Sequence, residues 1–397
     1  GTVVGLLAEM MAAGLNANLG GREQIPVEVE RQVAGWAREW FGFPETARGV
    51  FTTGTSQATL MAIWVARVGA LGDSVRTQGL RTQELRAYAA TTAHGSVAKA
   101  MDLAGLGSDA LCLVPVDENY RMDLQALRQA IATDREAGAR PFLVVGSAGT
   151  VDTGSIDDLE GLGRLCREFS LWFHVDGALG ALGCWSSELA PKFSGMDQAD
   201  SIAFDFHKWG QVPYDAGFLL VRDGDRQRRT FVAPTHYLGH EKRGAAAGEE
   251  WPCDFGPDLS RGFRALKTWW TVRHFGTRRL GAMMANTCAL AVTLARQIES
   301  EPLLELMAPV SLNIVCFRYR AAPGFVDTLN AHIAMAVQES GIALPSTTIL
   351  GGRRVLRVAL VNHRTTEKDL TALLSAVVHL GQRFSRHRPA RQAMDFI

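Results

Sequence analysis

The chain has 397 residues, of which 47% are hydrophobic and 21% charged, as in an ordinary globular protein with a sizeable core. Its 41 basic and 41 acidic residues cancel, and no apolar run is as long as a membrane span, so we expect neither nucleic-acid nor membrane binding. The six scattered cysteines form no C-x-x-C pair and no zinc-type spacing with histidine, so we expect free thiols in a reducing cytoplasm and no metal site.

The first residues enter a helical pattern at once, without an initiator methionine or a recognisable cap. We therefore expect that the natural protein has a further segment before Gly1. A second helix should begin at Pro26, because a first-turn proline is followed there by acidic residues near the positive end of the helix. Residues 1–45 are thus expected to form an N-terminal helical segment.

From residue 46 onward, short apolar strands alternate with amphipathic helices. The strands are predicted at 49–52, 86–89, 111–114, 142–145 and 171–175, and the helices at 56–67, 96–103, 124–132 and 159–169. This alternation is typical of a mainly parallel sheet with helices on both faces. After one more strand at 199–204, the strand at 217–221 follows too soon for a helical crossover, so it should run antiparallel.

The pattern changes after residue 222. Residues 239–250 are polar and rich in glycine and alanine, and we expect them to be mobile. A long helical region follows at 259–300, and then strands at 313–317 and 356–360 alternate with helices at 326–339 and 367–380. The predicted domains are therefore the N-terminal segment 1–45, a large domain 46–300 and a small C-terminal α+β domain 301–397.

A lysine beside a histidine, His207-Lys208, comes soon after the apolar run 199–204. Upstream, Asp176 ends another apolar run. A lysine amine forms Schiff bases, and a buried carboxylate keeps a pyridinium nitrogen protonated. Together the two residues indicate a site for pyridoxal 5'-phosphate (PLP).

Four loops at the carboxyl ends of the predicted strands should gather around this pair, because ligands of parallel sheets bind at that edge. The first loop precedes a helix, and its hydroxyls suit either an anion site or a simple N-cap. The side chains that the loops offer are Thr55 and Ser56 for an anion, His94 for stacking on a flat ring, Thr150 for a hydroxyl at the rim, and Ala178 for close approach of a ring to the backbone.

In order and spacing, these loops and the lysine resemble the group II PLP-dependent decarboxylases, which include the aromatic L-amino-acid, glutamate and cysteine-sulfinate decarboxylases. The similar motifs extend over nearly the whole chain and read TTGTSQATLMA, TTAHGSVAKA, VGSAGTVDTGSIDDL, WFHVDGALGA, DFHKWG, SRGFRALKTWW and SLNIVCFRY. The resemblance implies an α/β fold, the PLP-dependent transferase fold type I, with a mainly parallel seven-stranded sheet and a small C-terminal α+β domain. It also implies a homodimer with active sites at the subunit interface.

The resemblance assigns roles around the cofactor ring. Lys208 would be the Schiff-base lysine, and Asp176 would pair with the pyridine nitrogen. His94 would stack on one face of the ring and Ala178 would lie against the other, with Thr150 close by.

The resemblance also assigns the phosphate to Thr55 and Ser56, with His207 nearby, and adds Asp205 to the cofactor-binding set. Tyr237 stands where the family has a mobile-loop tyrosine that protonates the substrate carbon after CO₂ leaves, although the usual Asp-Pro-x-Tyr spacing is altered here. The predicted catalytic residues are therefore Lys208, His94, Tyr237 and Asp176.

The expected reaction is decarboxylation of an L-amino acid, with an aromatic substrate as a candidate, to an amine and CO₂. Two alternatives keep the cofactor: an oxidative aldehyde synthase and an aminotransferase. A serine hydrolase is another, since Ser56, Asp176 and His207 occur in α/β-hydrolase order. The last is a PLP-fold protein without catalytic activity.

Overall fold

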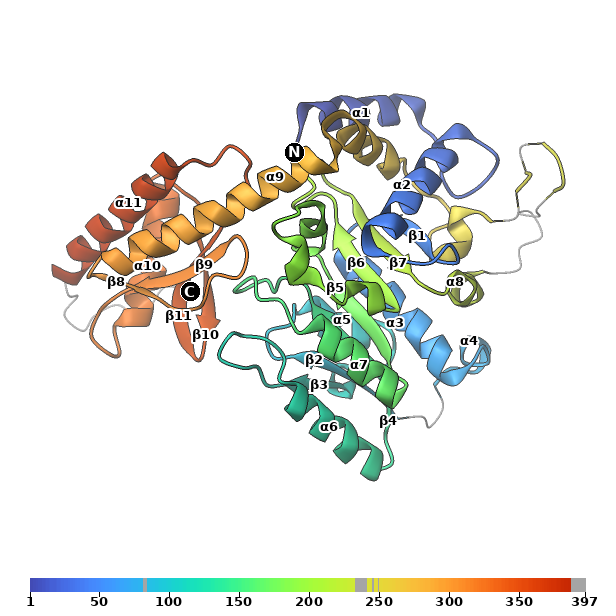
Figure 1. Cartoon of the computed structure of the whole chain (residues 1–397), viewed down its shortest axis with the longest axis horizontal. Coiled ribbons are helices and arrows are strands. Elements are labelled where there is room, and N and C mark those ends of the chain that lie inside the picture. The colour runs from blue at the N-terminus through green and yellow to red at the C-terminus, as the bar shows by residue number, and fades with distance from the viewer. Residues whose placement is uncertain (81–83, 233–240, 245, 249, 387–397) are drawn as a thin grey trace, which may run out of the picture. The chain divides into compact units, whose positions relative to one another are not determined.

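The computed structural model describes residues 1–80, 84–232, 241–244, 246–248 and 250–386 (Figure 1). The chain divides into two compact units, of which the larger comprises Gly1–Val151 and Ser155–Ala285 and the smaller Asp152–Gly154 and Asn286–Ile397. Within the described ranges, no helix combines the length and the apolar character that crossing a bilayer requires. The predicted domain boundaries at residues 45 and 300 stay a prediction.

A seven-stranded sheet forms the centre of the larger unit, with the order β1-β7-β6-β5-β4-β2-β3. The strands are β1 (Arg48–Thr52), β2 (Leu85–Ala90), β3 (Leu111–Val114), β4 (Arg140–Ser147), β5 (Trp172–Asp176), β6 (Ser201–Asp205) and β7 (Gly217–Val221). The pairs from β6 across to β3 are parallel, whereas β7 is antiparallel to both of its neighbours. The predicted mainly parallel sheet and its antiparallel last strand are confirmed.

Helices cover both faces of this sheet, as the side chains of β5 demonstrate. Trp172 belongs to the same buried apolar cluster as Met61 of α3 (Thr55–Leu71). Phe173, the next residue, packs at Gly146 beside Leu162 of α7 (Leu159–Phe169). Because successive side chains of a strand point to opposite faces, α3 and α7 lie on opposite faces of the sheet (Figure 1).

The other helices of the larger unit agree largely with the sequence. They are α1 (Val3–Leu15), α2 (Ile25–Phe41), α4 (Val75–Gln78), α5 (Ser96–Leu103), α6 (Leu124–Glu136), α8 (Gly224–Phe231) and the first part of α9 (Arg264–Ser300). The prediction that the first helix has no cap is wrong, because Thr2 Oγ1 accepts a hydrogen bond from Gly5 N at 3.0 Å. The long helix begins at Arg264 rather than 259 and bends at Gly276, whose φ is 74°.

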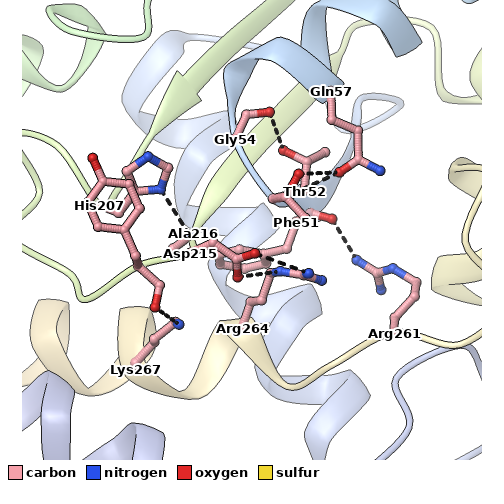
Figure 2. Close-up of polar contacts among 12 residues, drawn as sticks. Phe51, Thr52, Gly54, Gln57, His207, Asp215, Ala216, Arg261, Arg264 and Lys267 are labelled. Carbon is pink, nitrogen blue, oxygen red and sulfur yellow. Dashed lines mark hydrogen bonds and ion pairs between the residues drawn. The ribbon is translucent and has the colours of Figure 1, made fainter.

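A buried ion pair joins α2 to the segment before α9. Arg261 and Glu30 have side chains that are 2% and 3% exposed, and two guanidinium nitrogens reach the two carboxylate oxygens at 2.6 and 3.1 Å. The guanidinium also donates to the carbonyl oxygens of Leu19 and Phe51, the second of which Figure 2 shows. A buried pair is favourable only when its remaining hydrogen-bonding groups are satisfied in this way.

The smaller unit contains a four-stranded antiparallel sheet with the order β10-β11-β9-β8. Its strands are β8 (Leu304–Leu306), β9 (Ile314–Tyr319), β10 (Ser346–Leu350) and β11 (Arg353–Ala359), and its helices α10 (Val326–Glu339) and α11 (Glu367–Arg386). The predicted α+β character is confirmed. The sequence did not reveal β8 and β10, because β8 has only three residues and β10 alternates poorly between buried and exposed positions.

Candidate active site

The strands that were predicted to carry the site end at one edge of the sheet. Since β7 is antiparallel to both β1 and β6, β1 runs in the same direction as β6 and the parallel strands beyond it. The carboxyl ends of β1, β2, β4, β5 and β6 therefore face the same way, and this is the edge where parallel sheets bind ligands. Asp176 and Asp205 are the last residues of β5 and β6.

Lys208 lies in the turn directly after β6 and pairs with Asp205. Its Nζ is 2.8 Å from Asp205 Oδ2, and the carboxylate is 2% exposed whereas the lysine side chain is 36% exposed. Asp205 Oδ1 accepts a hydrogen bond from Thr55 N at 2.8 Å. One buried carboxylate thus fixes both the lysine amine and the start of α3. The three-residue spacing in DFHK was a signal for this pair that the sequence analysis did not use.

Asp176 is buried, and burial raises its pKa. The Ala178 N–H, which donates to Asp176 Oδ1 at 3.1 Å, and the charges of Lys208 and His94 act in the opposite direction. A carboxylate in this position is stabilised by a further cation close to it. The surroundings of Asp176 therefore suit a protonated ring nitrogen, and the backbone of Ala178 lies beside the same carboxylate.

The ring of His94 has a fixed orientation at the start of α5. Its Nδ1 accepts a hydrogen bond from Ser96 N at 3.1 Å and lies 2.8 Å from Ser96 Oγ, so the neutral ring carries its proton on Nε2. His94 is exposed, so a ring face is accessible for stacking. Thr150 is buried, and its Oγ1 contacts Ser155 Oγ at 3.0 Å, within its own loop. The predicted place of Thr150 near a bound ring stays a prediction.

The first turn of α3 offers a hydroxyl that the protein itself leaves unsatisfied. Thr55 Oγ1 is buried and has no hydrogen-bond partner among the described residues. The alternative that Thr55 and Ser56 are simple N-caps is wrong, because the N-cap position of α3 is Gly54 and no side chain caps the helix. An unsatisfied buried hydroxyl costs free energy, which a phosphate oxygen at a helix N-terminus would recover. The donor set therefore fits the phosphate of PLP.

His207 directly precedes Lys208 in the chain, and its side chain is 5% exposed. Its Nδ1 accepts a hydrogen bond from Ala216 N at 3.0 Å (Figure 2), and its Nε2 is 3.7 Å from Asp205 Oδ2. Burial lowers the pKa of His207, and the charge of Asp205 partly offsets this. Among the described residues, Asp205 and Ala216 orient the ring, whereas a hydrolase triad would require Asp176 in that role.

The structure adds residues to which the sequence analysis gave no role. In Figure 2, Arg264 of α9 pairs with Asp215, and Lys267 of α9 donates to the carbonyl oxygen of the preceding residue, Tyr214. Ala216 of the same turn donates its N–H to His207. Both basic residues lie in the motif SRGFRALKTWW, which was the signal in the sequence that could have singled them out. Tyr237 lies outside the described residues, as do positions 239, 240, 245 and 249 of the segment predicted to be mobile, so both expectations stay predictions.

Comparisons with known proteins agree with this geometry. Residues 2–320 match the family model described as the pyridoxal-dependent decarboxylase conserved domain. The chain is 30% identical over 396 residues to an aromatic-L-amino-acid decarboxylase of Bacillus atrophaeus, covering 97% of this chain and 80% of that protein. It is 29% identical over 382 residues to a phenylacetaldehyde synthase of Arabidopsis thaliana, covering 93% and 77%. The crystal structure of Oryza sativa TDC with PLP and tryptamine has a TM-score of 0.89 at 25% identity, covering 96% of this chain and 82% of that one.

Proposed function

Because this chain belongs to the pyridoxal-dependent decarboxylase family and is a PLP-dependent amino-acid decarboxylase, we propose that it removes CO₂ from an aromatic L-amino acid and releases the corresponding amine. The predicted family, fold type, enzyme class and cofactor are confirmed. The observation that carries the PLP-dependent chemistry is the pairing of Lys208 with the buried Asp205 at the edge of the sheet where Asp176 ends β5.

Different residues of the site would bind different parts of the cofactor. Lys208 would bind it covalently, Asp176 would face its ring nitrogen, and Thr55 with the first turn of α3 would hold its phosphate. When bound, PLP supplies an electron sink for the electrons left when the carboxylate departs. Asp176 would keep a proton on the ring nitrogen, and His94 presents a ring of fixed orientation on which a flat cofactor can stack.

The aromatic substrate is supported by two relatives. One is an aromatic-L-amino-acid decarboxylase, and the other is a TDC crystallised with tryptamine. Incubation with L-tryptophan, L-tyrosine, L-phenylalanine, L-histidine and L-glutamate tests this proposal, with CO₂, amine, aldehyde and hydrogen peroxide measured together. We expect CO₂ and amine from an aromatic substrate at least about tenfold faster than from L-glutamate, a difference of about 1.4 kcal/mol in barrier. Equal rates would contradict the substrate class.

The choice between amine and aldehyde is assigned to Tyr237. The Arabidopsis relative is an aldehyde synthase, so related chains differ in product. A tyrosine acid that protonates the substrate carbon favours the amine over reaction with oxygen. We expect Tyr237→Phe to slow amine formation and to raise the share of aldehyde and peroxide at least about tenfold, which requires only about 1.4 kcal/mol of relative barrier. The measurement is the product ratio in one reaction mixture.

Tyr319→Phe, in the smaller unit, is the matched removal of a tyrosine hydroxyl and should leave that ratio unchanged. A wild-type protein that forms mostly peroxide, or a Tyr237→Phe protein with the wild-type ratio, would show that the assignment of Tyr237 is wrong.

We also propose a homodimer with the active sites near the subunit interface. One face of α1 carries apolar side chains that are largely exposed, among them Val3 (73%), Leu6 (55%) and Met10 (64%). A contiguous exposed apolar surface of this kind marks a protein contact. The wild type should elute in light-scattering chromatography at twice the 43.1 kDa chain mass.

Leu6→Glu should weaken the dimer at least about tenfold, because a charge would be buried at the contact. Leu344→Glu, which changes an apolar residue of the smaller unit that is 87% exposed, should not weaken it. A monomeric wild type with full activity would contradict the dimer.

The location that we propose is the cytoplasm. All six cysteines are free thiols, two of them only half-buried. Free thiols persist in reducing compartments and form disulfides in oxidising ones. Fractionation of the source cells with an antibody against the protein would test this location.

A further inference from the structure

A buried lysine on α9 has no role in the site as described so far. The side chain of Lys267 is 1% exposed, and its Nζ lies 2.9 Å from Glu9 Oε2 of α1. The same Nζ donates to the Tyr214 carbonyl oxygen at 3.0 Å (Figure 2). A buried ammonium is costly unless a carboxylate and hydrogen-bond acceptors surround it. Glu9 and the Tyr214 carbonyl therefore hold this charge between α1 and the turn that follows the active-site lysine.

The turn at residues 214–216 is attached at each of its positions. Lys267 holds the carbonyl of Tyr214, and Arg264 pairs with both carboxylate oxygens of Asp215 at 2.8 and 3.4 Å. Ala216 donates its N–H to His207 Nδ1 at 3.0 Å. The ring of Tyr214 also lies against the ring of His207, with 4.1 Å between centroids. The turn therefore fixes the histidine ring beside Lys208.

This arrangement determines where the proton of His207 lies. Since Nδ1 accepts a backbone N–H, the neutral ring carries its proton on Nε2, which is directed toward Asp205 Oδ2 at 3.7 Å. Protonation of Nδ1 would place two N–H groups against each other. The charged groups facing the ring are Asp205, Lys208, Asp215 and Lys267, and burial outweighs them to lower the pKa of His207. The attached turn thus favours the neutral ring with its proton on Nε2.

One face of α1 covers the segment that leads from the lysine to this turn. Thr2 N donates to the Gln211 carbonyl oxygen at 3.0 Å. Gly5 packs so closely on Pro213 that a Cβ would collide with the proline ring. Glu9 reaches the buried ammonium. Spacings of three and four residues place these contacts on one side of the helix, whereas the exposed apolar side chains occupy other positions.

We propose that α1 is a clamp on the active-site turn, in which Glu9 and Lys267 are positioning residues that fix the ring of His207 beside the Asp205–Lys208 pair. The proposal rests on the assignment of Lys208 to the PLP site, but not on the substrate or the product. Because the exposed face of α1 is the proposed dimer contact, the clamp also links subunit assembly to the geometry around the lysine.

The test follows the bound cofactor rather than turnover. The visible absorbance of the holoenzyme is measured between about pH 5.5 and about pH 9, in steps of about half a pH unit, which brackets the ordinary histidine pKa. The proteins compared are the wild type, Glu9→Gln and Lys267→Met. In both variants we expect the histidine step to lie at higher pH than in the wild type, nearer the ordinary histidine pKa of about 6.5, because a released turn no longer holds the ring in its buried position. PLP binding to the apoprotein, measured by tryptophan fluorescence, should weaken at least about tenfold in Lys267→Met.

Two further variants sharpen this result. The double variant combines Glu9→Gln with Lys267→Met. Its PLP Kd should equal that of Lys267→Met alone, because Glu9 has no partner once the ammonium is absent and its replacement then costs nothing further. Arg279→Met removes an exposed cation from the same helix and should match the wild type in both measurements.

Two results would contradict the proposal. A lower Tm in Lys267→Met, with the titration and the PLP affinity of the wild type, would make Lys267 a purely structural residue and overturn the proposal. Losses of PLP affinity that add up in the double variant would also overturn it, because the two residues would then act independently. If Lys267→Met does not fold, Glu9→Gln decides through the same titration, since Glu9 is 46% exposed and its replacement removes no buried apolar side chain. Neither readout requires an amino acid, so a wrong substrate or product assignment would leave the result unchanged.

Discussion

Lys208→Ala should abolish both decarboxylation and the covalent attachment of PLP. Nζ of Lys208 is held 2.8 Å from the buried Asp205, so an amine is presented at the edge where Asp176 also lies. Loss of a covalent nucleophile lowers turnover by roughly 10³-fold or more, equivalent to about 4 kcal/mol. Borohydride reduction followed by peptide mapping should find the cofactor on the peptide that contains Lys208 in the wild type.

Two controls separate the chemistry of the amine from its charge. Lys208→Arg keeps a cation beside Asp205 but cannot form the bond, so it should be as inactive as Lys208→Ala while retaining more of the wild-type Tm. Lys192→Ala, an exposed lysine on the same unit, should retain full labelling. Cofactor found on another lysine after reduction would end the assignment of Lys208.

The architecture was predictable because its elements follow local rules. Strands β5 and β6 are mostly apolar, with one polar residue each (His174 and Ser201) before the aspartate that ends them, and every residue in them is buried. The helix expected at 159–169 has the same bounds in the structure, since Asp158 caps its first turn and the strongly amphipathic pattern ends with it. The short gap before β7 was sufficient to predict an antiparallel strand.

The contacts among the site residues were less predictable, because they join positions far apart in the chain. Thr55 and Asp205 are 150 residues apart in the sequence, and the paired residues Lys267 and Glu9 are separated by even more residues. No periodicity relates such positions. The cap of α1 was missed because Thr2 comes at the very start of the chain, where no preceding residues mark a helix boundary. Long-range polar contacts of this kind depend on the completed fold.

Asp176→Asn should lower turnover by at least about 10²-fold, or about 2.7 kcal/mol, while the protein remains folded. An asparagine amide can still hydrogen-bond the ring nitrogen of PLP, but it has no charge to keep a proton there. The visible absorbance of the bound cofactor should therefore change together with turnover. Asp200→Asn is the control, since it removes a half-buried carboxylate that accepts the Phe173 N–H just before β6. It should change turnover by less than about threefold, which is about 0.7 kcal/mol.

The stability of the apoprotein distinguishes a cofactor partner from a structural acceptor at Asp176. Burial raises the pKa of this carboxyl in the folded chain above its ordinary value, so the folded state binds the proton more tightly than the unfolded chain does. The contribution of Asp176 to stability is then present at acidic pH and is lost as pH rises through the raised pKa. Replacing it with the neutral asparagine should leave the apoprotein at pH 8 at least as stable as the wild type, whereas the rise in Tm on adding PLP should shrink. An apoprotein that loses stability at pH 8, with turnover near normal, would identify Asp176 as a structural acceptor of the Ala178 N–H alone.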